Sequence, residues 1–160
     1  MKRSVDPSSL LIVQISRLAR LADQLLSDEL APHGLTVQEF RILGQLMGEE
    51  GISQKDLAER LSVRSATLSP VLEALHDRGV ITRRASPDDA RVKLIALDPD
   101  KTSFGAAVTP LAALEKRTMA GLSRDDRKIL QGLLAKLTSN IDAAMSARST
   151  KVPERGRHVA

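Results

Sequence analysis

The sequence predicts a mainly α-helical protein with one small β-hairpin. Apolar residues recur at helical spacing along most of the 160-residue chain. Between the helical stretches, two runs rich in branched residues, 80–84 and 91–97, flank the turn-rich segment 86–90. This arrangement is typical of a β-hairpin. Gly, Pro, Ser and Asp residues separate the stretches, as expected for short elements packed around one core.

Residues from about 7 to 31 predict one long amphipathic helix. Its apolar stripe consists of Leu11, Ile15, Leu18, Ala22 and Leu25, widened by Leu26 and Leu30. The Pro-His-Gly segment 32–34 interrupts this helix. Thr36 followed by Glu39 then forms a capping box, in which each residue satisfies a backbone N–H of the other, and this box opens a second helix that ends before Gly48.

The next two helices predict a helix-turn-helix. Ser53 suits an N-cap, and Asp56 occupies the position from which it can return the capping bond. This short helix ends near Leu61, and a new helix over 65–78 follows a three-residue turn. Gly79 lies just past its end, where a left-handed C-cap favours glycine. The second helix of such a pair presents its outer face to a partner.

The hairpin after this pair predicts a wing that carries much of the chain's basic charge. The net charge of the whole chain is +4. The basic residues of segment 78–93 are Arg78, Arg83, Arg84, Arg91 and Lys93, against Asp88 and Asp89. A charged hairpin taken alone is usually a solvated face. Beside a helix-turn-helix it indicates nucleic-acid binding, because the wing lies over phosphates or the minor groove when the helix enters the major groove.

Two further helices complete the predicted fold. Asp98 and Pro99 open one of them, and the segment 121–123 ends it. Ser123 and Asp126 form another capping box for a last amphipathic helix that extends to about residue 147. Residues 148–160 lack an apolar pattern and predict a short, basic, disordered tail.

Composition excludes several classes of function. The chain has no Cys, which excludes disulfides, thiolate metal sites and thiol redox chemistry. With no Trp, no Tyr and two Phe, it offers no aromatic platform for single-stranded bases. Apolar runs such as 10–13 are far shorter than the roughly 20 residues of a membrane span, and no signal-peptide pattern opens the chain. We therefore expect a cytoplasmic protein.

Enzymatic patterns are scarce, and no cofactor is expected. Glu73-x-x-His76 has the spacing of half a di-iron carboxylate site, but a helical-bundle metalloenzyme needs a second copy. Asp88 and Asp89 lie in a turn-rich loop, where paired carboxylates are normally solvated. The chain is therefore predicted not to be an enzyme. A winged helix that binds protein remains an alternative, although Arg64, Thr67 and Ser69 make the exposed helix face polar rather than apolar.

Segment 35–97 resembles the multiple-antibiotic-resistance regulator (MarR) family of bacterial winged-helix transcription factors. The residues that carry the resemblance are Leu35-Thr36-x-x-Glu39-Phe40, Ser53-Gln54-x-x-Leu57-Ala58-x-x-Leu61, Ala66-Thr67-Leu68-Ser69-Pro70-Val71-Leu72-x-x-Leu75 before Gly79, and Asp89-x-Arg91. Ser123-x-x-Asp126-Arg127 resembles the start of the last helix of the family. The resemblance therefore covers nearly the whole chain.

The resemblance implies a single domain over 7–147, with a DNA-binding lobe at about 35–97 and dimerisation helices at about 7–31 and 99–147. The implied DNA-binding residues are Ser53, Gln54, Arg64, Ser65, Thr67, Leu68, Ser69, Arg83, Arg84, Asp89, Arg91 and Lys93. Arg91 corresponds to the wing arginine of the minor groove. Asp89 either holds its guanidinium or caps the turn.

The implied function is a homodimeric regulator of double-stranded DNA, most often a repressor in this family, that reads a pseudo-palindromic operator. Exposed Leu and Ile stripes on the first and last helices support the dimer. A peroxide-sensing branch of the family shares Pro70 but senses with a cysteine, which this chain lacks. We therefore expect a small organic anion as effector, an aromatic carboxylate or its thioester. Candidate cations are Arg17, Arg20, His33 and Arg41, each of which could instead be solvated.

Overall fold

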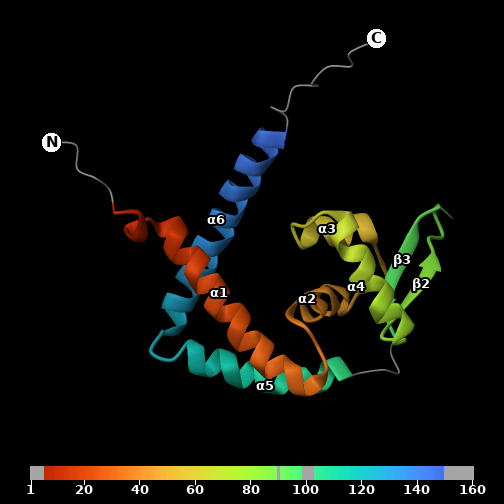
Figure 1. Cartoon of the computed structure of the whole chain (residues 1–160), viewed down its shortest axis with the longest axis horizontal. Coiled ribbons are helices and arrows are strands. Elements are labelled where there is room, and N and C mark those ends of the chain that lie inside the picture. Colours follow the sequence, from red (N-terminus) through yellow and green to blue (C-terminus); the bar gives the residue numbers. More distant parts are fainter. Residues whose placement is uncertain (1–5, 90, 99–102, 150–160) are drawn as a thin grey trace, which may run out of the picture. The chain divides into compact units, whose positions relative to one another are not determined.

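The computed structural model describes residues 6–89, 91–98 and 103–149. It forms two compact units, one that ends at Thr118 and one that begins at Met119. The first unit contains, in order, the 3-10 helix η1 (Pro7–Ser9), α1 (Leu11–Leu30), the 3-10 helix η2 (Ala31–His33), α2 (Val37–Leu46), β1 (Ile52–Ser53), α3 (Gln54–Arg60), α4 (Ser65–Asp77), β2 (Ile81–Ala85), β3 (Lys93–Leu97) and α5 (Ser103–Thr118), and the second contains α6 (Arg124–Ser149) (Figure 1). The mainly helical fold with a small sheet confirms the predicted fold class.

The N-terminal stretch is divided where the sequence predicts one continuous helix. Asp6 caps η1 by accepting a hydrogen bond from the Ser8 N–H at 3.0 Å. Leu10 is extended, with φ −66° and ψ 130°, so α1 begins only at the following residue. At the other end Gly34 adopts a left-handed conformation, with φ 65°, and the chain turns into α2. In the first unit, α1 lies against α2 and α5 (Figure 1).

The predicted capping box opens α2. The Thr36 hydroxyl accepts from the Glu39 N–H at 3.1 Å, and the Glu39 carboxylate accepts from the Thr36 N–H at 2.7 Å. The second carboxylate oxygen of Glu39 pairs with Arg78 at 2.5 Å, and this side chain is only 9% exposed. Arg78 also donates to the Gly34 carbonyl at 3.2 Å. The start of α2 is thereby tied to the end of α4.

The helix-turn-helix forms as the sequence predicts. Ser53 caps α3 by accepting from the Asp56 N–H at 3.1 Å, while its hydroxyl donates to the Asp56 carboxylate at 2.7 Å. In the turn between the helices, Ser62 adopts a left-handed conformation with φ 53°. Gly79, with φ 65°, ends α4 and donates to the His76 carbonyl at 2.7 Å. This is the C-cap that favours glycine.

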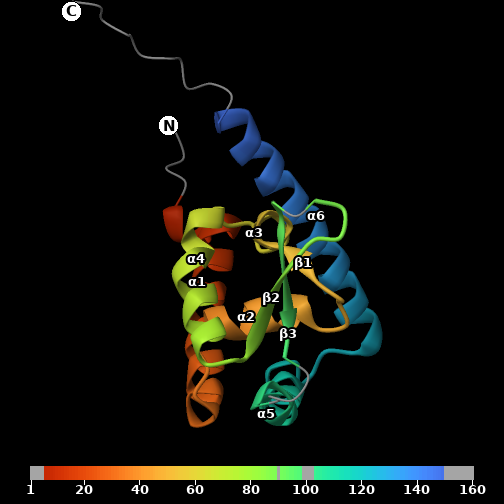
Figure 2. The ribbon, with the colours of Figure 1, turned by 90° about the vertical axis from the view of Figure 1, so that its right-hand side faces the viewer.

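The sheet has the order β1-β3-β2, and both pairs of strands are antiparallel. The register of the wing hairpin runs from Ile81 opposite Leu97 to Ala85 opposite Lys93. Strand β1 was not predicted, because two residues are too short to show an alternating pattern. It forms because the free edge of β3 accepts a partner, with Ile52 opposite Ile95. The hairpin projects beside α4 (Figure 2).

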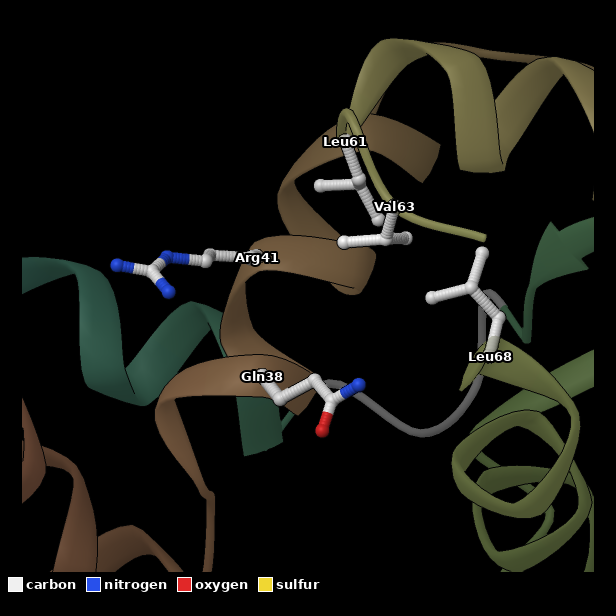
Figure 3. Close-up of a pocket in the computed structure, with 5 residues that line it drawn as sticks. All are labelled: Gln38, Arg41, Leu61, Val63 and Leu68. Atoms are coloured by element: carbon white, nitrogen blue, oxygen red, sulfur yellow. The ribbon is translucent and has the colours of Figure 1, made fainter. Parts of the chain in front are cut away.

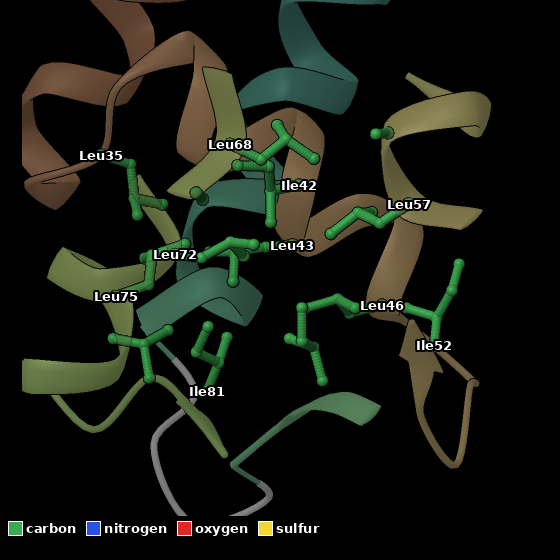
Figure 4. Packing of buried hydrophobic residues seen from close by; sticks show 14 of the residues in the cluster. Leu35, Ile42, Leu43, Leu46, Ile52, Leu57, Leu68, Leu72, Leu75 and Ile81 are labelled. Atoms are coloured by element: carbon green, nitrogen blue, oxygen red, sulfur yellow. The ribbon is translucent and has the colours of Figure 1, made fainter. Parts of the chain in front are cut away.

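The core of the first unit lies between α2, the helix-turn-helix and the sheet (Figure 4). Its largest fully buried side chains are Leu30, Ile42, Leu43, Leu46, Leu57, Leu68, Leu72, Leu75, Ile81 and Ile95. Burying each of these side chains contributes roughly 1.5–3 kcal/mol relative to leaving it in water. Because α4 supplies three of them, its rotation about its own axis is fixed by the core.

The second unit begins with the predicted capping box. Ser123 and Asp126 exchange backbone hydrogen bonds of 2.9 and 3.1 Å. Hydrogen bonds from the Ser123 hydroxyl and N–H lower the pKa of Asp126, so this cap weakens as the pH falls through that pKa. Residues 99–102, where the sequence predicts the start of a helix, and most of the predicted tail, 150–160, lie outside the described residues. No helix in the described chain is long and apolar enough to cross a membrane.

Replacing Thr36 by alanine should lower the free energy of unfolding by about 1 kcal/mol, because the Glu39 N–H loses its capping acceptor. Urea denaturation followed by circular dichroism measures this change. Thr36→Ser keeps the hydroxyl and serves as the matched control, which should retain most of the stability. An equal loss in both variants would show that the Thr36 methyl group, rather than the cap, carries the effect.

Candidate nucleic-acid interface

The N-terminal half of α4 presents a polar face to solvent. Arg64, Ser65, Thr67 and Ser69 are all exposed, as predicted for the outer face of this helix. Leu68 is a correction to the predicted interface. Its side chain is 1% exposed and belongs to the core, because it lies one turn before Leu72 on the inner face of the helix. Apart from Ala66 and Pro70, the exposed residues of this half of α4 are therefore polar.

The N-terminus of α3 contacts this helix through Gln54. The side-chain nitrogen Nε2 of Gln54 donates to the Ser65 carbonyl at 2.9 Å and to the Ser69 hydroxyl at 2.8 Å. The neighbouring Ser53 hydroxyl is occupied by its cap with Asp56. Ser53 therefore orders the start of α3, and Gln54 joins α3 to α4. No local sequence pattern indicates these bonds, because they span 11 and 15 residues.

The wing carries its candidate residues in exposed positions, but they differ in their partners. Arg84 donates to the Glu50 carbonyl, which ties β2 to the segment before β1. Its guanidinium lies against Gly51, where an added Cβ would be 3.5 Å from Nη2. Within the described residues, Arg83, Arg91 and Lys93 form no ion pair. These three cations are the ones available to a polyanion.

The contacts of Asp89 distinguish between its two expected roles. Its carboxylate accepts a hydrogen bond from the Arg91 backbone N–H at 2.9 Å. Across the described part of the chain, no ion pair joins Asp89 to the Arg91 guanidinium. In this structure Asp89 therefore caps the turn, which is the second of the two roles expected for it. The backbone bond is favoured because it spans only two residues and orders the tip of the hairpin.

Arg78 lies in the basic stretch of the sequence, but its guanidinium already has partners within the fold. Its guanidinium is shared between the Glu39 carboxylate and the Gly34 carbonyl. At the same end of α4, His76 Nδ1 lies 3.2 Å from the Ile81 carbonyl. No group of three or more His, Asp or Glu that could hold a metal occurs among the residues that the structure describes.

A pocket of about 230 Å³ lies between α2 and the helix-turn-helix. It is lined by Gln38, Arg41, Leu61, Val63 and Leu68. Leu61, Val63 and Leu68 gather on one side, whereas the Arg41 guanidinium points away from them (Figure 3). Arg41 pairs with Asp23 of α1 at 2.5 Å. Of the four cations considered for an effector, Arg41 is the one that lines this pocket.

This arrangement has the parts that double-stranded DNA requires. The exposed groups of α4 can donate hydrogen bonds to base edges, and an α-helix fits the major groove. The free cations of the wing can neutralise phosphates beside that groove. The sequence missed the engagement of Arg78 and Arg84, because counts of charge do not show which guanidinium groups already have partners in the fold.

Comparison with known proteins supports this assignment. The sequence pattern of the MarR family matches residues 33–92. The HTH-type transcriptional repressor Mb2911 of Mycobacterium bovis is 32% identical over 119 residues, which cover 71% of this chain and 83% of that protein.

Solved structures show the same fold. The transcriptional repressor CouR bound to a 23-mer DNA duplex is 26% identical, with a TM-score of 0.74, and the likeness covers 84% of this chain and 99% of that one. CouR from Rhodococcus jostii RHA1 bound to p-coumaroyl-CoA is 22% identical, with a TM-score of 0.74, over 85% of this chain and 94% of that one.

The helix-turn-helix, the wing and the polar face of α4 occur together in the segment that matches the family. The identity to a repressor extends well beyond this segment, over most of both chains. The chain belongs to the MarR family of winged-helix transcriptional regulators.

Proposed function

We propose that the protein is a homodimeric repressor that binds a pseudo-palindromic operator and is released by a small organic anion. The observation that carries this proposal is the exposed polar face of α4 beside a wing with free cations. DNA-bound CouR, which shares the fold, supports binding to duplex DNA. The family consists of regulators, and we infer that this chain acts by binding rather than by catalysis.

In this proposal α4 enters the major groove. Ser65, Thr67 and Ser69 then face base edges, and Arg64 lies at the helix N-terminus near the phosphates. Arg91 reaches the neighbouring minor groove from the tip of the hairpin, whose turn is ordered by Asp89. Arg83 and Lys93 are placed to neutralise phosphates.

Exposed apolar side chains on α1 and α6 support the dimer. Leu11 is 73% exposed on α1, and Ile129 is 61% exposed on α6. Further exposed large apolar side chains of these helices are Ile12, Val13, Leu18, Leu21, Leu25, Leu133, Leu134, Leu137, Ile141 and Met145. So large an apolar surface on a single chain indicates an interface. A two-fold dimer would place two recognition helices roughly 34 Å apart on an operator.

The pocket beside Arg41 is the proposed effector site. Its apolar wall can receive an aromatic ring, and a carboxylate at its rim can replace Asp23 as the partner of Arg41. Its volume of about 230 Å³ lies below the roughly 300–1,000 Å³ of pockets for drug-sized ligands, so we infer a ligand no larger than a one-ring acid, with any thioester group extending into solvent. CouR, solved with p-coumaroyl-CoA, binds a ligand of this chemical class.

Release of DNA requires that the effector binds a form with a displaced recognition helix more tightly. Val63 lies in the turn that precedes α4, and Leu68 lies within α4. A ligand that pushes on this wall therefore acts directly on the element that reads DNA.

Arg91→Ala should weaken operator binding by about 1–3 kcal/mol and lower the slope of log affinity against log salt by about one, while leaving the fold intact. Fluorescence anisotropy at several salt concentrations measures both quantities. Asp89→Asn keeps an acceptor for the Arg91 N–H and should cost less. If Arg91→Ala binds the operator as tightly as the wild type, the wing is not part of the DNA interface.

Truncation before Leu130 should abolish the dimer and tight operator binding, because it removes most of α6 and one half-site alone contributes too little affinity. Analytical ultracentrifugation gives the oligomeric state. Deletion of residues 148–160 is the control and should leave the dimer intact. If the longer truncation yields a monomer that still binds the operator tightly, the proposal that the protein acts as a dimer is wrong.

Arg41→Leu should preserve operator binding but raise about tenfold or more the concentration of phenolic acid needed for release, because it removes the charged partner of the carboxylate. A mobility-shift assay with phenolic acids and their thioesters measures release. Arg20→Leu removes a cation outside the pocket and is the matched control. Release by mild hydroperoxide, with no response to any anion, would contradict an anionic effector.

A further inference from the structure

Both N–H donors of the Gln54 side-chain amide are engaged in hydrogen bonds. Its nitrogen donates to the Ser65 carbonyl and to the Ser69 hydroxyl, at 2.9 and 2.8 Å. The orientation of the amide follows from chemistry, because a backbone carbonyl only accepts and the nitrogen must therefore face it. An amide nitrogen carries two protons, and both are used here. Gln54 has only the oxygen Oε1 left, which is an acceptor.

The bond from Gln54 uses one of the two lone pairs of the Ser69 hydroxyl and leaves its proton free to donate. The hydroxyl accepts from Gln54, and within the described residues it donates its own proton to no acceptor. Ser16 shows the usual alternative, since its hydroxyl donates to the Ile12 carbonyl of its own helix at 2.9 Å. Ser69 is exposed on the face of α4 that lies beside Gln54. Its hydroxyl therefore offers a donor to whatever lies on that face.

Pro70 makes the bonds from Gln54 more important for α4. It lies inside the helix and has no N–H, so the Ala66 carbonyl lacks the donor that normally follows four residues later. The first turn of α4 is thus joined to the rest of the helix by one backbone bond fewer. Both bonds from Gln54 reach residues on the N-terminal side of Pro70. They hold the turn from which the polar face projects.

We propose that Gln54 is a positioning residue that acts on DNA through Ser69, and that Ser69 donates a hydrogen bond to an acceptor on a base edge in the major groove. This inference rests on the proposed DNA-binding function. The acceptors available there are N7 of either purine, O6 of guanine and O4 of thymine, whereas cytosine offers the donor N4. Ser69 should therefore disfavour cytosine at the base that it contacts. Gln54 makes no phosphate contact, because its remaining carbonyl oxygen is repelled by a phosphate.

The test begins with selection of the operator from random duplexes by the full-length wild-type protein. Affinity is then measured for every single-base variant of that site, at several salt concentrations. The proteins compared are wild type, Ser69→Ala, Ser69→Thr, Gln54→Leu and the double variant Gln54→Leu/Ser69→Ala. Gln45→Leu is the matched control, since Gln45 is a half-buried glutamine of α2 whose side chain forms no hydrogen bond among the described residues.

Ser69→Ala should lose about tenfold discrimination at one base position in each half-site, as expected for one hydrogen bond. Ser69→Thr keeps the hydroxyl and should keep the preference. Gln54→Leu should lose discrimination at the same position as Ser69→Ala, and the double variant should lose little more than either single variant. The salt slope should stay unchanged in all of them, and Gln45→Leu should behave as wild type.

The proposal is overturned if Gln54→Leu keeps full discrimination at the Ser69 position, or if it lowers the salt slope by about one, which would indicate a phosphate contact. If Gln54→Leu does not fold, Gln54→Glu replaces it. Its carboxylate accepts the Ser69 proton, so discrimination should again be lost, and retained discrimination would equally overturn the proposal. A wild-type protein that selects no duplex would instead defeat the DNA-binding function itself, on which the inference depends.

Discussion

The structure depends above all on the burial of one face of α4. Leu68, Leu72 and Leu75 lie on the same side of the helix and are fully buried. Exposing any of them would forfeit roughly 1.5–3 kcal/mol, so the helix has a single favourable rotation about its axis. With this rotation Ser65, Thr67 and Ser69 stay exposed in the N-terminal half of the helix. The side chains that α4 exposes, and that we propose to contact DNA, are therefore set by the packing of its buried face.

Polar contacts at both ends of α4 complete this placement. At the C-terminal end, the half-exposed Arg78 pairs with a nearly buried Glu39 and donates to the Gly34 carbonyl. At the N-terminal end, Gln54 holds the turn before Pro70. Apolar packing fixes how far α4 is rotated, and these directional bonds fix how its ends lie against α2 and α3. A ligand that moves the recognition helix must strain or break some of them.

Bonds within the fold also decide which basic side chains contribute free charge to the surface. Several basic side chains close together in the sequence look like one binding patch, yet Arg78 and Arg84 are used inside the fold. Arg83, Arg91 and Lys93 form no ion pair in the described chain and are the cations of this stretch that a phosphate backbone could meet. Mutational effects on salt dependence should therefore be concentrated in these three residues rather than spread over the whole stretch.

Elements with local signals could be predicted from the sequence: the capping box of Thr36 and Glu39, the C-cap at Gly79 and the helix-turn-helix with its hairpin. Such signals act within about four residues, which a single sequence displays. In contrast, the pairing of β1 with β3, the bond from Gln54 to Ser69 and the contact of Arg78 with Glu39 across 39 residues are seen only in the folded structure. Which distant side chains meet depends on how the helices pack, and no local pattern records that packing.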